Sequence, residues 1–481
     1  MVYLKAGSRP IYMQKFLNLP NKNNGPLNQI AKYLIAAILI VVPLYPKFPF
    51  IQIPGTYVSI RFEDFLLAIT AILAFIMIIS RVKQVFDDKI SRAMLIFLLI
   101  GSVSLLAGVF LTQTVILNIG ILHLLRRVEY FVPFFAILAF YPYQKDKNLE
   151  FYIKVLMLTV FVAFLYGIGQ KYLNLPVIMT QNMESSKGIA LRWTPGAQLT
   201  STFAGHYDLA SFMVLVLPIF VCLFFTVKGK LTKIFLLLAA LSGYWLLINT
   251  ASRISLASYL MAVIISLLLI KKYKAIIFVV IISLVLSGFS ASLFSRYKSL
   301  IDVYLQKVKS VKIVNVNTFG LIVSAQTVAL PERTEAPAPT APPKPIIEDR
   351  STSIRLNVEW PRAIRSFYKS PLIGTGYSSI GLASDNDYLR LLAEVGLLGF
   401  LSFILILFRI VLVFASALPL TEKLSGIKLG FVAGVIGGFF GILLNAVFID
   451  VFEASKLAII FWLLIGMAVY VVKDLNYEYK N

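Results

Sequence analysis

The sequence predicts an all-helical integral membrane protein that crosses the bilayer many times. Its 481 residues are 59% hydrophobic and only 14% charged, and a soluble domain could not bury so much apolar surface. The apolar residues also form runs of roughly 17–25 residues, the length that a helix needs to cross the hydrocarbon core of a bilayer. Basic residues flank particular runs, and this pattern sets the expected orientation.

About twelve apolar runs are predicted to span the membrane. They cover residues 30–46, 63–80, 93–112, 127–142, 151–169, 207–227, 232–249, 252–270, 274–291, 388–412, 426–448 and 455–472. The run at 127–142 is short and is preceded by arginines, so it is the weakest of the set. The predicted organisation is a tail at 1–29, nine spans within 30–291, a long loop at 292–387, three spans within 388–472 and a tail at 473–481.

Positive charge predicts that both termini lie on the cytoplasmic side of the membrane. The first 32 residues carry five lysines and arginines and no acid, and the N-terminal tail lacks a cleavable signal pattern, so the first span is expected to act as an uncleaved anchor. Counting spans from there brings three further short basic loops to the same side, as the positive-inside rule requires. The segments then expected outside are 47–62, 170–206 and 292–387.

Composition excludes several function classes. The net charge of +22 is attributed to cytoplasmic loops, so no nucleic-acid partner is expected. The chain has one cysteine, Cys222, and two histidines, His123 and His206, which argues against a disulfide or a Cys- or His-ligated metal. No Gly-rich phosphate loop, HExxH or paired-cysteine pattern is present. We therefore expect chemistry that needs neither a metal nor another cofactor.

The long outer loop divides into three parts. Residues 311–330 have the β-branched composition of a hairpin, and the Pro/Ala-rich stretch at 331–345 is predicted to be extended or disordered. An amphipathic helix is predicted over 352–369, because Arg355, Glu359 and Arg362 recur at i, i+4 and i+7. A guanidinium-rich face of this kind suits phosphate or other acidic groups, although a solvated, salt-bridged face is the alternative.

Other outer residues have both a structural and a functional interpretation. Arg253 follows Ser252 at the expected outer end of a span, where it either snorkels to the interface or binds an anion. Arg192 lies in an outer loop and His206 stands just before the next helix. Asp385 and Asn386 precede the helix that returns to the membrane, so Asp385 either caps that helix or accepts a proton.

One run carries glycines at a four-residue spacing. Gly430, Gly434 and Gly438 fall on one face of the predicted helix at 426–448. Small residues at this spacing let two helix backbones approach closely in a membrane. The pattern predicts close helix packing rather than a binding site.

In order along the chain, these pieces resemble the bacterial O-antigen ligase and O-antigen polymerase superfamily. The resemblance rests mainly on Arg355, Trp360, the PLIGTG turn at 371–376 and DNDYLRLLAEVGLLG at 385–399. The superfamily pattern has an amphipathic helix of the form Arg-xxxx-Trp, a Pro-Leu-x-Gly-x-Gly turn, and His-Asn-x-Tyr-Leu with two glycines downstream. Ser252-Arg253 and the IRFEDFL segment at 60–66 also fit.

The resemblance implies a polytopic, GT-C-like glycosyltransferase. Such an enzyme moves a glycan from undecaprenyl diphosphate to an acceptor hydroxyl on the outer face of the cytoplasmic membrane, with membrane lipid around it and a chain-length regulator as a further candidate partner. It assigns Arg253 and Arg355 to the diphosphate, with Arg192 and Arg362 as secondary candidates. The residues assigned to acceptor positioning are Glu359, Trp360, Asn386 and Tyr388.

One departure from the superfamily pattern affects the expected reaction. Asp385 stands where the pattern has histidine, so Asp385 is the candidate base, acceptor-orienting group or helix cap, and His206 is the alternative base. The missing histidine favours polymerisation of repeat units over ligation to a lipid or protein acceptor. A twelve-span transporter and a non-enzymatic glycan-binding scaffold are the alternatives from other classes, but the second half of the chain does not repeat the first.

Overall fold

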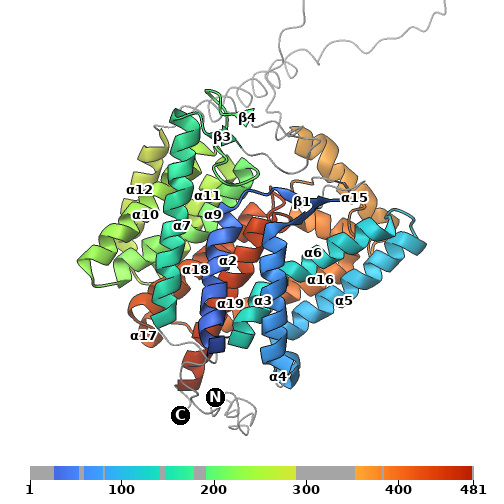
Figure 1. Cartoon of the computed structure of the whole chain (residues 1–481), viewed down its shortest axis with the longest axis horizontal. Helices are drawn as coiled ribbons and strands as arrows, with labels where there is room; N and C mark the ends of the chain where they lie inside the picture. The colour runs from blue at the N-terminus through green and yellow to red at the C-terminus, as the bar shows by residue number, and fades with distance from the viewer. Residues whose placement is uncertain are drawn as a thin grey trace, which may run out of the picture.

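The computed structural model describes residues 26–53, 59–79, 82–140, 147–177, 191–288, 353–381 and 384–478. These residues form a bundle of long, roughly aligned helices with two short β-hairpins at one end, called the hairpin end below (Figure 1). The hairpin predicted at 311–330 and the Pro/Ala-rich stretch at 331–345 lie outside the described residues.

A helix overlaps each of the twelve predicted runs. These helices are α2 (Pro26–Leu44), α3 (Phe62–Ile78), α5 (Lys89–Phe110), α6 (Leu117–Phe140), α7 (Lys147–Tyr172), α9 (His206–Thr226), α10 (Lys230–Asn249), α11 (Arg253–Leu269), α12 (Tyr273–Gly288), α16 (Asp387–Ser416), α18 (Gly426–Asn445) and α19 (Ser455–Glu478). Among the described residues, eight helices are long and apolar enough to cross a membrane, and α11 and α12 are shorter apolar helices. The polytopic helical class is confirmed, whereas a count of twelve spans stays a prediction.

Short elements complete the description. Two are hairpins that the helical prediction did not include: β1 (Pro49–Gln52) pairs antiparallel with β2 (Ser59–Arg61), and β3 (Pro176–Val177) pairs with β4 (Leu191–Arg192). The remaining helices are α4 (Val82–Asp87), the π-helix η3 (Arg355–Glu359), α15 (Trp360–Lys369) and α17 (Leu420–Lys423). The amphipathic helix predicted at 352–369 thus consists of η3 continued by α15.

The start of α6 corrects the predicted run at 127–142. The helix begins ten residues earlier and includes Arg126 and Arg127, because both guanidinium groups have partly buried acidic partners. Arg126 lies 2.7 Å from Asp64 and 2.6 Å from Glu129, and Arg127 pairs with Glu453. A hydropathy scale counts each charged residue against a membrane-spanning helix. The free-energy cost of burying that charge falls, however, when the charge is paired inside the bundle.

Helices α9, α18 and α19 form the core, and glycine explains the tightest packing. A Cβ atom at Gly434 would lie 2.3 Å from the Cα atom of Ile219, and one at Gly438 would lie 2.6 Å from the backbone oxygen of Leu215. The predicted glycine face of α18 is therefore confirmed as a packing face against α9. Helix α19 is the central helix, since its most apolar stretch is buried throughout.

Candidate active site at the hairpin end

Three helix ends meet at Asn445, the last residue of α18. Its side-chain nitrogen donates to the hydroxyl of Ser211 in α9 at 2.7 Å, and its side-chain oxygen accepts from the hydroxyl of Ser255 in α11 at 3.2 Å. These bonds bring the first residues of α9 and α11, His206 and Arg253, to the same end of the bundle. Arg253 is half-buried and directly follows Ser252, whose hydroxyl caps α11 by accepting from the Ser255 amide.

Arg355 contacts residues from two other parts of the chain. Its Nε donates to Oδ2 of Asp385 at 2.9 Å, and its Nη2 donates to the Tyr207 hydroxyl at 3.3 Å. The Arg355 side chain is 8% exposed and that of Asp385 27% exposed. The Tyr207 ring packs on the His206 ring, with centroids 4.0 Å apart. Two predicted site residues, Arg355 and Asp385, are therefore in direct contact, and His206 is linked to them through Tyr207.

The environment of Asp385 keeps its carboxyl easier to protonate than an ordinary aspartate. Burial raises its pKa, the Arg355 guanidinium lowers it and the charge of Asp450 raises it, and the balance is an increase. Burial also raises the pKa of Glu359, and the carboxylates of Asp385 and Asp450 raise it further. A proton acceptor of moderate strength therefore lies beside a fixed positive charge.

Glu359 and Trp360 present polar atoms that the described residues leave unsatisfied. Glu359 Oε2 and Trp360 Nε1 are both buried, and neither has a hydrogen-bond partner within the part of the chain that the structure describes. The Trp360 ring lies against Phe448, with centroids 6.2 Å apart. Burying such groups without partners is costly, so they are candidates for contacts with a bound molecule.

The remaining predicted residues have mainly structural contacts. Asn386 caps α16, because its side-chain oxygen accepts from the Leu389 amide at 2.9 Å. The Tyr388 hydroxyl donates to the backbone oxygen of Leu443 at 2.8 Å. Arg192 lies in β4 opposite Pro176, and Arg362 lies on α15, where its charge lowers the pKa of Glu359.

A buried ionic network, which sequence reasoning missed, lies beneath the site. Arg390 is 1% exposed and pairs with Glu394 at 3.2 Å and with Asp450 at 3.1 Å. Arg127 donates to the backbone oxygen of Phe452 at 3.0 Å. The network joins α6, α16 and the connection between α18 and α19. Arg390 and Glu394 lie four residues apart in the DNDYLRLLAEVGLLG segment. This i, i+4 spacing of opposite charges is the sequence feature that indicates an ion pair on a helix.

The PLIGTG turn enters a break in α16. Gly396 interrupts the helix with φ 67° and ψ −173°, and the freed amide of Leu397 bonds to the backbone oxygen of Pro371 at 2.8 Å. The amide of Gly376 bonds in return to the backbone oxygen of Glu394 at 2.8 Å. The glycines of the turn and those downstream of Asp385 are thus two halves of one interlocked structure, which fixes α15 relative to the start of α16.

The IRFEDFL segment at 60–66 lies at the same end of the bundle, where its polar side chains link three helices. Arg61 donates to the Ser455 hydroxyl at 3.2 Å, and that hydroxyl donates to Glu63 at 3.2 Å. Asp64 receives Arg126 from α6. The next residue after Ser455, Lys456, is fully buried and donates to the backbone oxygen of Thr202 at 2.8 Å, in the loop that leads to His206.

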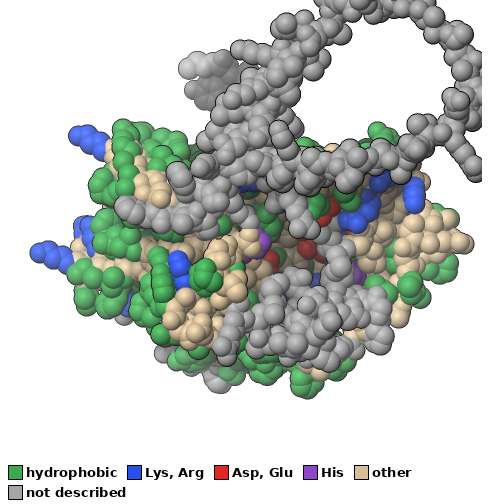
Figure 2. All heavy atoms as spheres, turned by 90° about the horizontal axis from the view of Figure 1, so that it is seen from above, with side chains coloured by type: hydrophobic (Ala, Val, Ile, Leu, Met, Phe, Trp, Pro, Cys, Tyr) green, Lys and Arg blue, Asp and Glu red, His purple; other side chains and the backbone are tan. Residues whose placement is uncertain are grey.

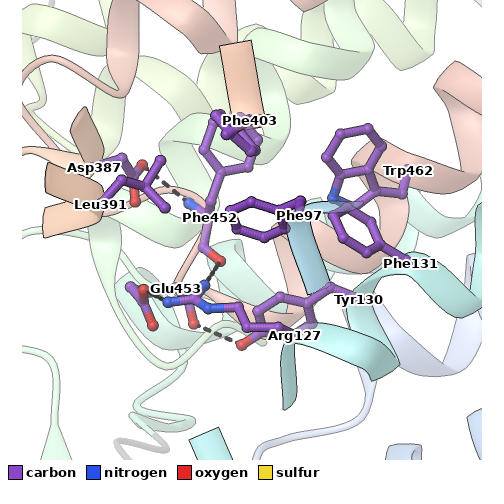
Figure 3. A pocket seen from close by; sticks show the side chains of 10 residues that line it. All are labelled: Phe97, Arg127, Tyr130, Phe131, Asp387, Leu391, Phe403, Phe452, Glu453 and Trp462. Carbon is purple, nitrogen blue, oxygen red and sulfur yellow. Dashed lines mark hydrogen bonds and ion pairs between the residues drawn. The ribbon is translucent and has the colours of Figure 1, made fainter. Parts of the chain in front are cut away.

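A small cavity lies beside Arg127. Its lining combines Arg127, Asp387 and Glu453 with aromatic rings from several helices (Figure 3). It encloses about 20 Å³, roughly room for a single water, so it cannot hold a sugar. Viewed from the hairpin end, the visible acidic and histidine side chains lie near the middle of the face, whereas basic side chains lie both there and at its edges (Figure 2).

The family comparison covers the segment that carries these features. Residues 235–404 match the model of the O-antigen ligase family. This segment is an O-antigen ligase family domain. It runs from α10 into α16 and includes Arg253, Arg355 and Asp385. Among curated proteins there is no significant match.

The presence of this domain confirms the resemblance read from the sequence. The chain is a multi-pass membrane protein, and the bacterial O-antigen ligase family to which the domain belongs implies glycan transfer from lipid-linked substrates in polysaccharide biosynthesis. Residues 207 and 450 contact the domain but lie outside the matched range.

Proposed function

We propose that this protein transfers a glycan from a polyprenyl diphosphate to a hydroxyl of another glycan at the outer face of the cytoplasmic membrane, and that it thereby polymerises repeat units. The hairpin end is then the outer face, and both termini are cytoplasmic. The contact between Arg355 and Asp385 carries the proposal, because it pairs an anion-binding group with a proton acceptor inside the family domain. A GT-C-like arrangement of twelve spans belongs to the same proposal.

The donor diphosphate is assigned to Arg355 and Arg253. A guanidinium group stays charged when partly desolvated and binds phosphate oxygens through two parallel bonds. Arg253 opens α11, where the helix dipole adds to its positive charge. Arg362 and Arg192 are secondary candidates, since both belong to elements at the same end. These groups stabilise the negative charge that develops on the departing lipid diphosphate.

The base is assigned to Asp385, with His206 as the alternative. As the acceptor oxygen forms its bond to the anomeric carbon, the bond from that carbon to the diphosphate oxygen breaks. The lipid diphosphate leaves with the bonding electron pair, and the acceptor proton passes to the Asp385 carboxylate. A carboxylate whose pKa is raised by burial is better suited to this step than an ordinary one.

Acceptor positioning is assigned first to Glu359 and Trp360. Their buried, unsatisfied atoms can bond to sugar hydroxyls, and the Trp360 ring offers an apolar surface for a sugar face. Asn386 and Tyr388 already bond to backbone groups, so their contribution is to fix the start of α16 beneath the acceptor. Polymerisation remains preferred over ligation because Asp385 replaces the histidine of the ligase-like pattern.

Reconstitution tests the proposal directly. The purified full chain in proteoliposomes is supplied with a polyprenyl diphosphate-linked oligosaccharide, and the products are separated by length. A ladder of products supports polymerisation, and a single transfer to an added acceptor supports ligation instead. Arg355→Ala should abolish transfer, whereas Arg365→Ala, an exposed arginine on the same helix, should retain it. Absence of transfer by the wild type together with solute flux would replace the enzyme by a transporter.

A further inference from the structure

We infer that Asp450 is a positioning residue that holds the Ser384–Asn386 segment and thereby aims Asp385 at the reacting groups. This inference rests on the proposed role of Asp385 in glycan transfer. Asp450 lies in the connection between α18 and α19, beyond the end of the O-antigen ligase domain at residue 404. It therefore extends the site to a part of the chain that the family match does not cover.

The geometry is that of one carboxylate receiving three successive backbone amides. Asp450 accepts from the amides of Ser384 at 2.7 Å, Asp385 at 3.2 Å and Asn386 at 3.0 Å. It also accepts from the Ser384 hydroxyl at 2.6 Å and from Arg390 Nη2 at 3.1 Å. With five donors converging on it, the Asp450 side chain is only 13% exposed. A carboxylate that receives several amides and a guanidinium group is held rigidly.

The backbone at Asp385 explains why such an anchor is needed. Asp385 has φ 47°, in the left-handed region, which costs roughly 1–2 kcal/mol for an L-residue. Turning residue 385 this way lets its own amide and both neighbouring amides face one carboxylate. The Asp385 side chain then faces Arg355. Without Asp450 the backbone of the segment can relax to a conformation of lower free energy, and the Asp385 carboxylate no longer has a fixed position.

Asp450 also acts on Asp385 through its charge. Burial raises the pKa of Asp450, but Arg390 and the Ser384 hydrogen bonds lower it below its usual value, so Asp450 is ionised when Asp385 titrates. The charged and titratable groups facing Asp385 are Arg355 and Glu359 from η3, Arg390 from α16 and Asp450 itself. Tyr207 from α9 reaches it through Arg355. Removing the negative charge of Asp450 therefore lowers the pKa of Asp385.

The test uses Asp450→Asn and a matched control in the reconstituted full chain. The control is Asp88→Asn, because Asp88 also accepts a backbone amide, a serine hydroxyl and a cationic side chain, but at the start of α5. Asp450→Asn should lower kcat by at least about tenfold with little change in the KM for the lipid-linked donor, and should move the acidic limb of the pH–rate profile to lower pH. Asp88→Asn should leave both unchanged.

A second measurement separates this inference from the proposed function. Hydrogen–deuterium exchange at the amides of 384–386 should become at least about tenfold faster in Asp450→Asn and stay unchanged in Asp88→Asn. Unchanged exchange in Asp450→Asn, or an active variant with an unmoved pH profile, overturns the positioning role. Faster exchange in a protein whose wild type transfers no glycan supports the anchor and overturns the proposed function instead.

Discussion

Gly396 is the point at which the PLIGTG turn and the broken helix α16 interlock, so an alanine there tests whether this joint is as tight as the structure indicates. The backbone at Gly396 has φ 67° and ψ −173°, a region that only glycine adopts readily. Forcing an L-residue into such a conformation costs about 1–3 kcal/mol. This backbone term applies even if the surroundings leave room for a methyl group.

The surroundings leave no such room. A Cβ atom at Gly396 would lie 2.4 Å from the backbone nitrogen of Gly374 and 2.5 Å from the carbonyl carbon and oxygen of Leu372. All three atoms belong to the backbone of the inserted turn, so relief requires the turn itself to move. Overpacking of this kind costs about 1–3 kcal/mol more. Gly396→Ala should therefore destabilise the protein by about 2–6 kcal/mol, a large share of a typical folding free energy.

The measurement is a denaturant titration of the purified protein in detergent micelles, followed by tryptophan fluorescence. Gly381→Ala is the matched control, because Gly381 also has a positive φ, 81°, but a Cβ atom there would meet no atom of the described residues within 4 Å. The control carries only the backbone term, about 1–2 kcal/mol. If Gly396→Ala unfolds at the same denaturant concentration as Gly381→Ala, the turn does not fill the break in α16 and the interlocked joint is wrong.

Three further outcomes follow from the same contacts. Arg355→Lys keeps the charge but loses the fork that reaches Asp385 and Tyr207, so transfer by the reconstituted protein should fall by about 10²-fold or more, and near-normal turnover would contradict the diphosphate role. Transfer should decline as the pH falls through the raised pKa of Asp385, and Asp385→Asn should be inactive at every pH. A raised folded-state pKa makes the ionised carboxylate destabilising at neutral pH, so Asp385→Asn should be at least as stable as the wild type at pH 7. Lower stability of the variant at pH 7 would contradict the direction of the pKa shift. Asn445→Ala removes the bonds to Ser211 and Ser255 and should cost about 1–2 kcal/mol in the same titration; an unchanged midpoint would mean that the three helix ends are held together by packing alone.

Hydropathy was sufficient to place the helices but not to delimit all of them. Each predicted run overlaps a helix because long apolar segments have no other stable structure in a bilayer. The predicted start of α6 was wrong because Arg126 and Arg127 are paired with acidic residues from distant parts of the chain. Pairing at this range leaves no periodic signal, since Asp64 lies 62 residues before Arg126.

The candidate site was likewise predicted only in part from the sequence. The local spacing of Arg355, Glu359 and Arg362 predicted one helix face, and the structure places that face against Asp385. Asp450 carries no comparable signal, because it stands alone in a connection and meets its partners only after α16 and α18 have packed. The family pattern does not point to it either, since the match ends at residue 404. Side chains that position others are therefore harder to predict than those that belong to a motif.

The aspartate in place of the family histidine is easier to understand from its surroundings than from the sequence. A histidine has a pKa near neutrality without help, whereas an aspartate needs an environment that makes its charge costly. Burial and the charge of Asp450 act in that direction at Asp385, and Arg355 opposes them. If the diphosphate of a bound donor takes over Arg355, the opposing contribution weakens and the pKa of Asp385 rises further, towards the range in which a carboxylate is an effective base. In this scheme donor binding strengthens the base, so the donor should bind before the acceptor reacts.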